Sequence, residues 1–272
     1  MDYKDDVVFP EGKRLAVSVH FPVEWWTVPD EDYIQNYRRE YGVKTGAWRL
    51  LDVFDRVGVR GTCHMNGIVA ERFPDLAKEI ARRGHDVSGH GYDQSHPQHL
   101  MAHDEERAVV RQTLEAIERV TGYRPKGWVT TGRRVSKETV RILAEEGLFW
   151  HSNHDIGDYP TPVEIDGKVI LDCPIQRYIN CDERRFLGMD GKGPPLSLRE
   201  IWEFFKDQVD ALRGAAQYEP LCFQFGAHAY MSGLPAYSWT LQRMLSYCKS
   251  FSEIWLVTTT ELAQFWLDHN LK

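Results

Sequence analysis

The sequence lacks an excess of basic charge. Among its 272 residues, 40 acidic side chains outnumber 33 lysines and arginines, and the formal net charge is −7. A protein that binds nucleic acid presents a basic face to the phosphate backbone. We therefore expect no nucleic-acid partner.

The chain also lacks a long apolar run. No stretch approaches the roughly 20 apolar residues that span a bilayer, and the first residues are acidic and polar where a secretory signal is basic and then apolar. We expect no membrane association and a cytoplasmic location. Residues 1–8 are interpreted as an N-terminal extension, because "DYKDD" matches the start of a common epitope tag.

Cysteine is scarce, and the cysteines form no recognisable spacing motif. The five cysteines are scattered, odd in number and never form a CxxC pair. This usage is typical of reduced thiols and excludes a zinc site built on thiolates. No GxGxxG turn follows the first apolar strand, so a dinucleotide-binding fold is not indicated.

Strand and helix patterns alternate along most of the chain. "LAVSVHF" predicts a strand, and the apolar residues of 47–59 recur at helical spacing up to a stop at Gly58. Asp104 and Ser136 are predicted helix N-caps, and Thr258 with Glu261 forms a capping-box pattern. Further strands are predicted within 59–65, 85–91, 127–132, 168–175, 221–228 and 253–258. Further helices are predicted within 67–84, 104–122, 136–147, 197–212, 236–250 and 259–270.

This alternation predicts parallel strands joined by crossover helices. About seven strands in a chain of this length suit a barrel better than an open sheet. We expect an α/β fold: one domain, residues 9–272, forming a distorted (β/α) barrel of about seven parallel strands. In such barrels the chemistry lies at the carboxyl ends of the strands. That rule selects 20–26, His64, 90–96, 130–134 and His228.

These strand ends resemble the motifs of the polysaccharide deacetylase (NodB-like) superfamily. "RLAVSVHFPVEWW" resembles its first motif, "EIARRGHDVSGHGYDQSH" its second, and residues 225–266 its C-terminal segment. "GWVTTGRR", "NHDIGDYP" and "NCDERRF" resemble elements of its allantoinase-type branch, which hydrolyses cyclic amides. The resemblance covers roughly residues 9–268. It implies a distorted barrel and hydrolysis of a C–N bond in an amide, cyclic amide or N-acetyl group.

The resemblance also raises the question of whether the site binds a divalent metal ion. Deacetylases of the superfamily hold a divalent cation with one carboxylate and two histidines four apart, and use an aspartate as base. Glu24 and His90 fall at two ligand positions, whereas Pro22 replaces the base and Gln94 the second histidine. We favour a site without a metal, in which Glu24 and His90 act directly. The alternative is one Zn, Mn or Co ion held by Glu24, His90 and His96.

His228 falls at the position of the family's general acid, and an imidazole that titrates near neutral pH can protonate a leaving nitrogen. Arg133 matches the arginine of the TGR turn and can grip a carboxylate or ureido oxygen through two parallel bonds. The expected catalytic residues are Glu24, His90, His228 and Arg133. The expected substrate-binding residues are Trp25, Asp93, Trp26, His64 and Asp158.

The remaining polar residues near these motifs are given structural roles. Asp158, Asn180, Asp182 and Arg185 either close over the site or hold the irregular segment 153–196 in place, and for Asp182 and Arg185 we favour structural ion pairing. His99 and His103 are expected in a hydrated loop and His85 at the start of a strand.

The leading functional hypothesis is hydrolysis of a non-peptide C–N bond in a small cyclic amide, imide or ureide. Water attack is assisted by Glu24, and His228 is the general acid. The alternative is a metal-dependent deacetylase of a polysaccharide or N-acetyl sugar. A third reading is a ligand-binding member with a degenerate site, which Pro22 and Ala229 suggest. The expected partners are a small-molecule substrate and further copies of the chain, as a dimer or tetramer.

Overall fold

The computed structural model describes residues 7–27, 33–154, 157–175, 182 and 196–271. In these residues one nine-stranded sheet runs in the order β6-β7-β5-β4-β3-β2-β1-β8, with β9 paired to β1. The strands are β1 (Leu15–His20), β2 (Thr62–Met65), β3 (Asp86–Gly89), β4 (Gly127–Trp128), β5 (Trp150–His151), β6 (Thr161–Ile165), β7 (Lys168–Asp172), β8 (Leu221–Gly226) and β9 (Ile254–Leu256).

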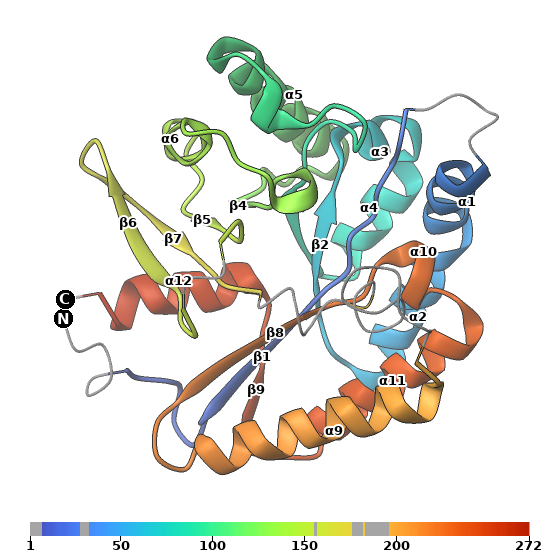
Figure 1. The fold of residues 1–272 in the computed structure, drawn as a ribbon, viewed down its shortest axis with the longest axis vertical. Coiled ribbons are helices and arrows are strands. Elements are labelled where there is room, and N and C mark those ends of the chain that lie inside the picture. Colours follow the sequence, from blue (N-terminus) through green and yellow to red (C-terminus); the bar gives the residue numbers. More distant parts are fainter. Residues whose placement is uncertain (1–6, 28–32, 155–156, 176–181, 183–195, 272) are drawn as a thin grey trace.

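The helices lie on the outer face of the sheet, except that α12 lies at one end of its interior (Figure 1). They are α1 (Tyr33–Tyr41), α2 (Ala47–Val57), α3 (Gly67–Arg72), α4 (Pro74–Arg82), α5 (His103–Thr121), α6 (Thr139–Glu145), α9 (Leu198–Ala215), α10 (Ala229–Ser232), α11 (Pro235–Lys249) and α12 (Thr259–His269). A π-helical turn, Gly42–Gly46, joins α1 to α2. No helix of the described residues is both long and apolar enough to cross a membrane.

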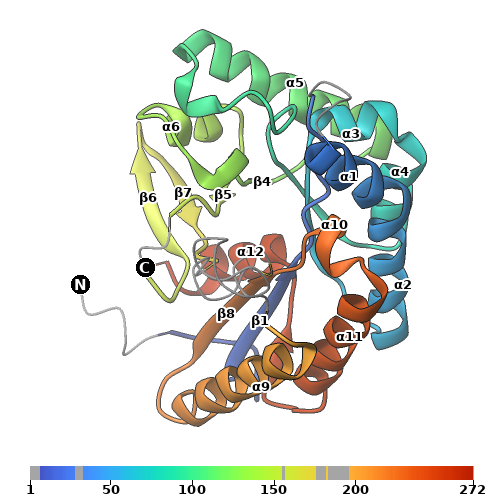
Figure 2. The same ribbon diagram turned by 45° about the vertical axis from the view of Figure 1, so that its right-hand side comes forward.

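The sheet curls because β1 exchanges partners along one edge. Its first three residues pair with β9 on that edge, and His20 pairs with Thr62 of β2, while β8 follows the whole of the other edge. Every pairing is parallel except that of β6 with β7. The resulting half-barrel is visible in Figure 2, with α5, α4, α2, α11 and α9 around it. The predicted single-domain α/β fold is confirmed, and the expected distorted barrel of about seven parallel strands is a half-barrel of nine strands. The sequence did not predict β5 or the antiparallel edge strand β6.

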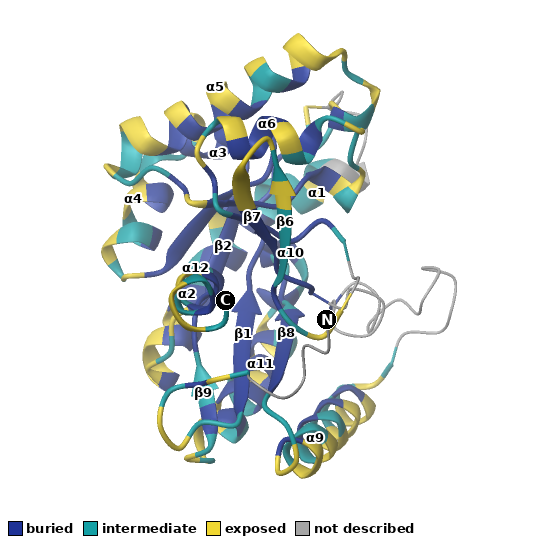
Figure 3. Cartoon of the chain, turned by 90° about the vertical axis from the view of Figure 1, so that its left-hand side faces the viewer, coloured by how far each residue is buried: buried dark blue, intermediate teal, exposed yellow. Residues whose placement is uncertain are grey.

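Side chains along β1 alternate between the two faces of the sheet. The face under the surrounding helices is apolar, and the face inside the curl is polar. All six residues of the strand are buried (Figure 3). Leu15, Val17 and Val19 belong to the core cluster that also includes the apolar faces of α2, α9 and α11. Ser18 and His20 alternate with them and point the other way, into the curl of the sheet. The strand ends therefore surround an interior rich in polar side chains.

Helix α12 occupies the amino-terminal end of this interior. The side chain of Thr258 accepts a hydrogen bond from Glu261 N, and the Glu261 carboxylate accepts one from Thr258 N, so the predicted capping box is confirmed. The hydroxyl of Thr260 donates to Asp86 at the start of β3 over 2.9 Å. The opposite, carboxyl-terminal end of the sheet is left for a site.

Two predicted N-caps are corrected by the structure. Helix α5 begins at His103 with Ala102 as its N-cap, so Asp104 lies in the first turn, where its charge favours the helix dipole instead. Helix α6 begins at Thr139, and Ser136 lies three residues earlier; its hydroxyl accepts from the backbone N–H of Thr139 over 3.1 Å.

The two ends of the described chain meet. The backbone N–H of Val8 donates to Asn270 Oδ1 over 2.7 Å, and Asn270 Nδ2 donates back to Val8 O over 3.1 Å. The domain therefore includes Val8, which the predicted boundary assigned to the extension; residues 1–6 lie outside the described part of the chain.

Candidate active site

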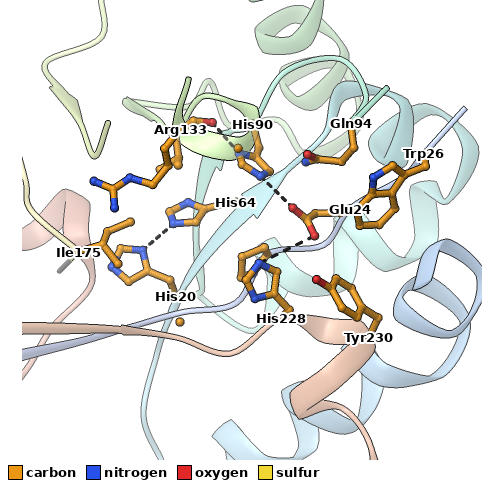
Figure 4. A pocket seen from close by; sticks show the side chains of 14 residues that line it. His20, Glu24, Trp26, His64, His90, Gln94, Arg133, Ile175, His228 and Tyr230 are labelled. Atoms are coloured by element: carbon orange, nitrogen blue, oxygen red, sulfur yellow. Dashed lines mark hydrogen bonds and ion pairs between the residues drawn. The ribbon is translucent and has the colours of Figure 1, made fainter. Parts of the chain in front are cut away.

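A cavity of about 180 Å³ opens at the carboxyl ends of the strands (Figure 4). Its lining comes from residues at or beyond the carboxyl-terminal halves of β1, β2, β3, β4, β7 and β8, so the curl of the sheet gathers segments that are far apart in sequence. Its lining residues are His20, Pro22, Glu24, Trp26, His64, His90, Gln94, Val129, Gly132, Arg133, Ile175, Gly226, His228 and Tyr230.

Glu24 is positioned by an extension of β1 beyond its last ladder residue. Val23 N donates to His64 O over 2.9 Å and forms an isolated bridge with Met65, so the chain stays extended. The carboxylate is only 7% exposed. Its Oε1 lies 3.1 Å from His90 Nε2, and its buried Oε2 has no hydrogen-bond partner within the described part of the chain. One oxygen is thus held in place and the other is available to a ligand or water.

His90 follows β3 and is fixed at both nitrogens. The carbonyl of Val129 can only accept, so the 2.5 Å contact places a proton on His90 Nδ1. The other nitrogen faces the Glu24 carboxylate, and that contact needs a proton as well. The Glu24 carboxylate and the His90 imidazole are therefore in direct contact, and His90 is held in place between Val129 and Glu24.

Asn66 ties the two motifs together from the end of β2. Its side-chain carbonyl accepts from Trp25 N over 2.9 Å, and its amide donates to the carbonyls of His90 and Gly91. The side chain is completely buried. It thereby fixes the spacing between the residue after Glu24 and the residue that follows β3.

His228 is oriented by Asp182, which lies 46 residues earlier in the sequence. Asp182 Oδ1 accepts from His228 Nδ1 over 2.6 Å, while Oδ2 accepts from His228 N and from the Ser232 hydroxyl, each over 2.7 Å. The second ring nitrogen, Nε2, lies 4.0 Å from Glu24 Oε2. The carboxylate fixes the tautomer and turns Nε2 toward the cavity. We interpreted Asp182 as half of an ion pair with Arg185; Asn180 and Arg185 lie outside the described residues.

Two more imidazoles form the floor of the cavity and are neutral. Burial lowers the pKa of His20 from 6.5 to about 4 and the pKa of His64 well below its usual value. Gln224 Oε1 accepts from His20 Nε2, His20 Nδ1 then accepts from His64 Nε2, and His64 Nδ1 accepts from Ser88, over 2.6 to 2.7 Å. All four ring nitrogens are used, so His64 lines the cavity without offering a hydrogen bond to a substrate.

The cavity has an aromatic side and a cationic side. Trp26 and Tyr230 meet edge to face with ring centroids 5.8 Å apart, near Glu24 and His228. Arg133 lies across the cavity, and its guanidinium extends toward Ile175 and His20, away from Glu24 (Figure 4). Its charge contributes to the lowered pKa of His20. This position suits binding of a remote substrate group better than contact with the reacting carbonyl.

Three expected substrate-binding residues do not line the cavity. Trp25 is buried against Phe73, with ring centroids 5.1 Å apart, because an extended chain that turns Trp26 inward turns its neighbour outward. Asp158 is exposed, and its charge acts on Cys222, near the amino end of β8 and far from the cavity. Asp93 is buried in the loop after β3, where it accepts from Ser95 N and His96 N.

The alternative metal-ligand set is not assembled either. The side chain of His96 is 67% exposed and its Nδ1 binds Asp93 over 2.8 Å, so it does not join Glu24 and His90. Within the described residues, three metal-binding side chains come within coordination distance only at His151, His154 and Asp172. Those residues were not predicted as ligands.

Comparisons with known proteins agree with the fold. A family model for polysaccharide deacetylase matches residues 38–149. A putative polysaccharide deacetylase of Schizosaccharomyces pombe is 23% identical over 249 residues, which cover 84% of this chain and 74% of the relative. The structure of a putative polysaccharide deacetylase from Mycobacterium smegmatis superposes with a TM-score of 0.87 at 24% identity, covering 98% of this chain and 95% of that one. The structure of PuuE allantoinase gives a TM-score of 0.87 at 23% identity, covering 100% and 98%.

Proposed function

We propose that the chain is a member of the polysaccharide deacetylase family, whose model matches residues 38–149, and that it hydrolyses a C–N bond other than a peptide bond. From this premise we propose a specific reaction. The substrate is a small cyclic amide, imide or ureide. Glu24 activates the attacking water, and His228 protonates the departing nitrogen. The observation that carries the proposal is that Glu24 Oε2 and His228 Nε2 face the same space 4.0 Å apart, each held from behind by a second side chain.

The proton transfers follow from this arrangement. Water loses a proton to Glu24 Oε2 as its oxygen adds to the substrate carbonyl, and the carbonyl π electrons move onto oxygen. When the tetrahedral intermediate collapses, the C–N bond breaks and His228 Nε2–H gives its proton to nitrogen. Asp182 stabilises the imidazolium before that step, because it accepts from Nδ1. Glu24 and His228 thereby act as base and acid in one turnover.

Gln94 is our candidate for the residue that donates a hydrogen bond to the oxyanion of the tetrahedral intermediate. It lines the cavity at the position four residues after His90. Its amide makes only a long 3.4 Å contact with Asn66 Oδ1, so an N–H remains for the substrate. A fixed N–H aimed at a developing oxyanion stabilises a transition state. The amide would then do electrostatically what a cation does in metal-dependent relatives.

The donor set of the cavity does not fit the metal of the metal-dependent deacetylases. That metal needs a carboxylate and two imidazoles, and here Gln94 stands in place of the second imidazole. Glu24 contacts both His90 and His228, but the described residues include no single donor atom from each of the three that lies within 4.8 Å of the other two. We therefore derive no step of this reaction through an ion in the cavity.

A second candidate is deacetylation of an N-acetyl sugar. The names of the S. pombe and M. smegmatis relatives favour it over the first, since both read polysaccharide deacetylase. The donor set and the small cavity favour a compact substrate, because cavities for drug-sized ligands reach roughly 300–1,000 Å³. The same acid and base serve either substrate, so the experiment must test both.

The test is a hydrolysis screen with two readouts. Purified protein is incubated with allantoin, hydantoins and other cyclic ureides while ring opening is followed, and with chitin oligosaccharides while acetate release is followed. We expect ring opening, lowered about 10²- to 10⁴-fold in kcat by Glu24→Gln and by His228→Ala. His96→Ala is the matched control and should keep full activity.

The outcomes separate the hypotheses. Acetate release alone, with the same loss in the two variants, would replace the first substrate class by the second. Binding of a ureide without turnover, unchanged in His228→Ala, would assign the protein to a ligand-binding role.

We propose further that the protein works in a reducing compartment and binds neither nucleic acid nor membrane. The four cysteines among the described residues, Cys63, Cys173, Cys222 and Cys248, are buried and free, which supports the cytoplasm. Assembly into a homodimer or tetramer stays a proposal that sedimentation of the purified protein tests.

A further inference from the structure

We propose that this protein holds a divalent transition-metal ion of the zinc class at a second site, formed by His151, His154 and Asp172. The proposal does not depend on the reaction assigned to the cavity. His151 ends β5 and Asp172 ends β7, and these two residues are direct partners in the parallel pairing of the strands. His154 follows three residues after His151. The site thus stands on a rigid sheet edge rather than on a loop alone.

The spacing of the donor atoms matches a shared ion. His151 Nδ1 lies 3.2 Å from Asp172 Oδ1, and His154 Nδ1 lies 3.7 Å from Asp172 Oδ2. One ligand atom from each of the three residues falls within 4.8 Å of the others. Ligands about 2.0 Å from a tetrahedral zinc stand roughly 3.3 Å apart. The side chains are therefore already arranged as three corners of a coordination shell.

The electrostatics also call for a cation. Asp172 is completely buried, and its Oδ2 has no hydrogen-bond donor among the described residues. In the same part of the chain, the basic side chains within 4.0 Å of its oxygens are the two histidines. The Nδ1 of His151 accepts a long 3.4 Å hydrogen bond from Asn153 N, which leaves two acceptors, Nδ1 and Oδ1, facing each other over 3.2 Å. A cation between them removes that repulsion and neutralises the buried carboxylate.

The donor chemistry narrows the class of ion. Two imidazole nitrogens and one carboxylate oxygen suit zinc and its first-row neighbours, whereas calcium and magnesium prefer oxygen ligands alone. His151 and Asp172 are fully buried, but the His154 side chain is 39% exposed and gives the ion a route from solvent. Three protein ligands leave one position open for water.

The site lies behind the cavity rather than in it. None of the three residues lines the cavity, but Ile175, three residues beyond Asp172, does. On the other side of β5, Asn153 Oδ1 accepts from Thr130 N over 2.8 Å, just before the turn that carries Arg133. An ion here fixes the ends of β5 and β7, and with them the wall on the Arg133 side of the cavity.

The test measures binding of the metal alone. Protein stripped with a chelator is titrated with Zn²⁺ by calorimetry and with Co²⁺, whose visible absorption reports tetrahedral nitrogen and oxygen ligation. We expect one ion per chain, and at least a tenfold loss of affinity in His154→Ala. His96→Ala is the matched control, because His96 is also a partly exposed histidine beside a carboxylate, and its affinity should equal that of the unaltered protein.

Other variants locate the ion. Glu24→Gln should bind zinc normally, and Asp172→Asn, if it folds by circular dichroism, should not bind it. Absence of binding at 100-fold excess Zn²⁺, or equal affinity in His154→Ala and His96→Ala, would overturn the proposal. So would loss of the ion in Glu24→Gln with retention in His154→Ala, since that result places the metal in the cavity.

Discussion

At the scale of single residues, Asp182 positions His228, the proposed general acid. Asp182 makes three contacts with the loop of His228, and its charge stabilises the imidazolium. We predict that Asp182→Asn lowers kcat by about 10²- to 10⁴-fold, because the amide no longer fixes the tautomer. Ser232→Ala, which removes one contact and no charge, should lose less than tenfold. Equal losses in the two variants, measured by steady-state kinetics, would make Asp182 a structural residue only.

A substitution of Arg133 tests whether the cationic side of the cavity binds substrate separately from the side that holds Glu24 and His228. Its guanidinium lies away from Glu24 (Figure 4), so it should bind substrate without taking part in the proton transfers. We predict that Arg133→Lys raises KM about tenfold or more and leaves kcat within a few-fold, because lysine cannot make a two-pronged contact. Arg134→Lys is the control at the exposed neighbouring position. A fall in kcat with unchanged KM would contradict the assignment.

A removable ion behind the cavity changes how chelation must be tested. In the His154→Ala background the second site is disabled, so any effect of a chelator reports on the cavity itself. We predict the same rate with and without chelator in that variant. A loss that zinc, manganese or cobalt restores would show that the cavity uses a metal after all.

The sequence indicated much of the site at this scale. The motifs placed Glu24, His90 and His228 at strand ends, and all three line one cavity. Trp26 was also distinguishable, since His20, Pro22, Glu24 and Trp26 alternate along one extended segment and Trp25 does not share their parity. The role of Asp182 was not accessible, because nothing in the sequence shows which distant carboxylate meets a given imidazole.

At the scale of the elements, glycines let the short central strands pack. Gly89 is paired with Trp128 across β3 and β4, and Gly127 with Trp150 across β4 and β5. A Cβ at Gly127 would lie 1.8 Å from the Trp150 ring. We predict that Gly127→Ala destabilises the fold by about 2 kcal/mol or more in urea titrations, since the ring has to move.

Gly214 provides the matched control, because it lies in α9 with no atom within 4 Å of an added Cβ. Gly214→Ala should be neutral or stabilise the protein by up to about 1 kcal/mol, as alanine favours helices. If both variants were equally stable, the packing of Trp150 on Gly127 would not contribute to the free energy of unfolding.

Element prediction failed where elements are short or lie at an edge. Strand β5 has two residues, too few for a periodicity, and is defined by its neighbours in the sheet. Strand β4 is equally short, but it lies within the longer run 127–132 that predicts a strand. Strand β6 contains Pro162 and is mostly half-buried, so its alternation is weak. The long helices and β1 were predictable because each carries a full repeat of buried positions.

For the whole molecule, buried neutral histidines govern stability in acid. Burial lowers the pKa of His20 and of His85 from 6.5 to about 4, so the unfolded chain binds protons first as the pH falls. The contribution of these two histidines to stability is complete above pH 6.5 and declines toward pH 4, by about 3 kcal/mol for each histidine. We predict that His85→Asn flattens this decline in urea titrations between pH 7.5 and 4.5, whereas the exposed His103→Asn does not.

The contact between Val8 and Asn270 makes the chain suitable for circular permutation. Ends that already touch can be joined by a short linker, and new termini can be opened at the exposed turn of Asp166 and Gly167 between β6 and β7. Such a circular permutant should fold with its cavity intact, because neither the joined ends nor the opened turn contributes a lining residue.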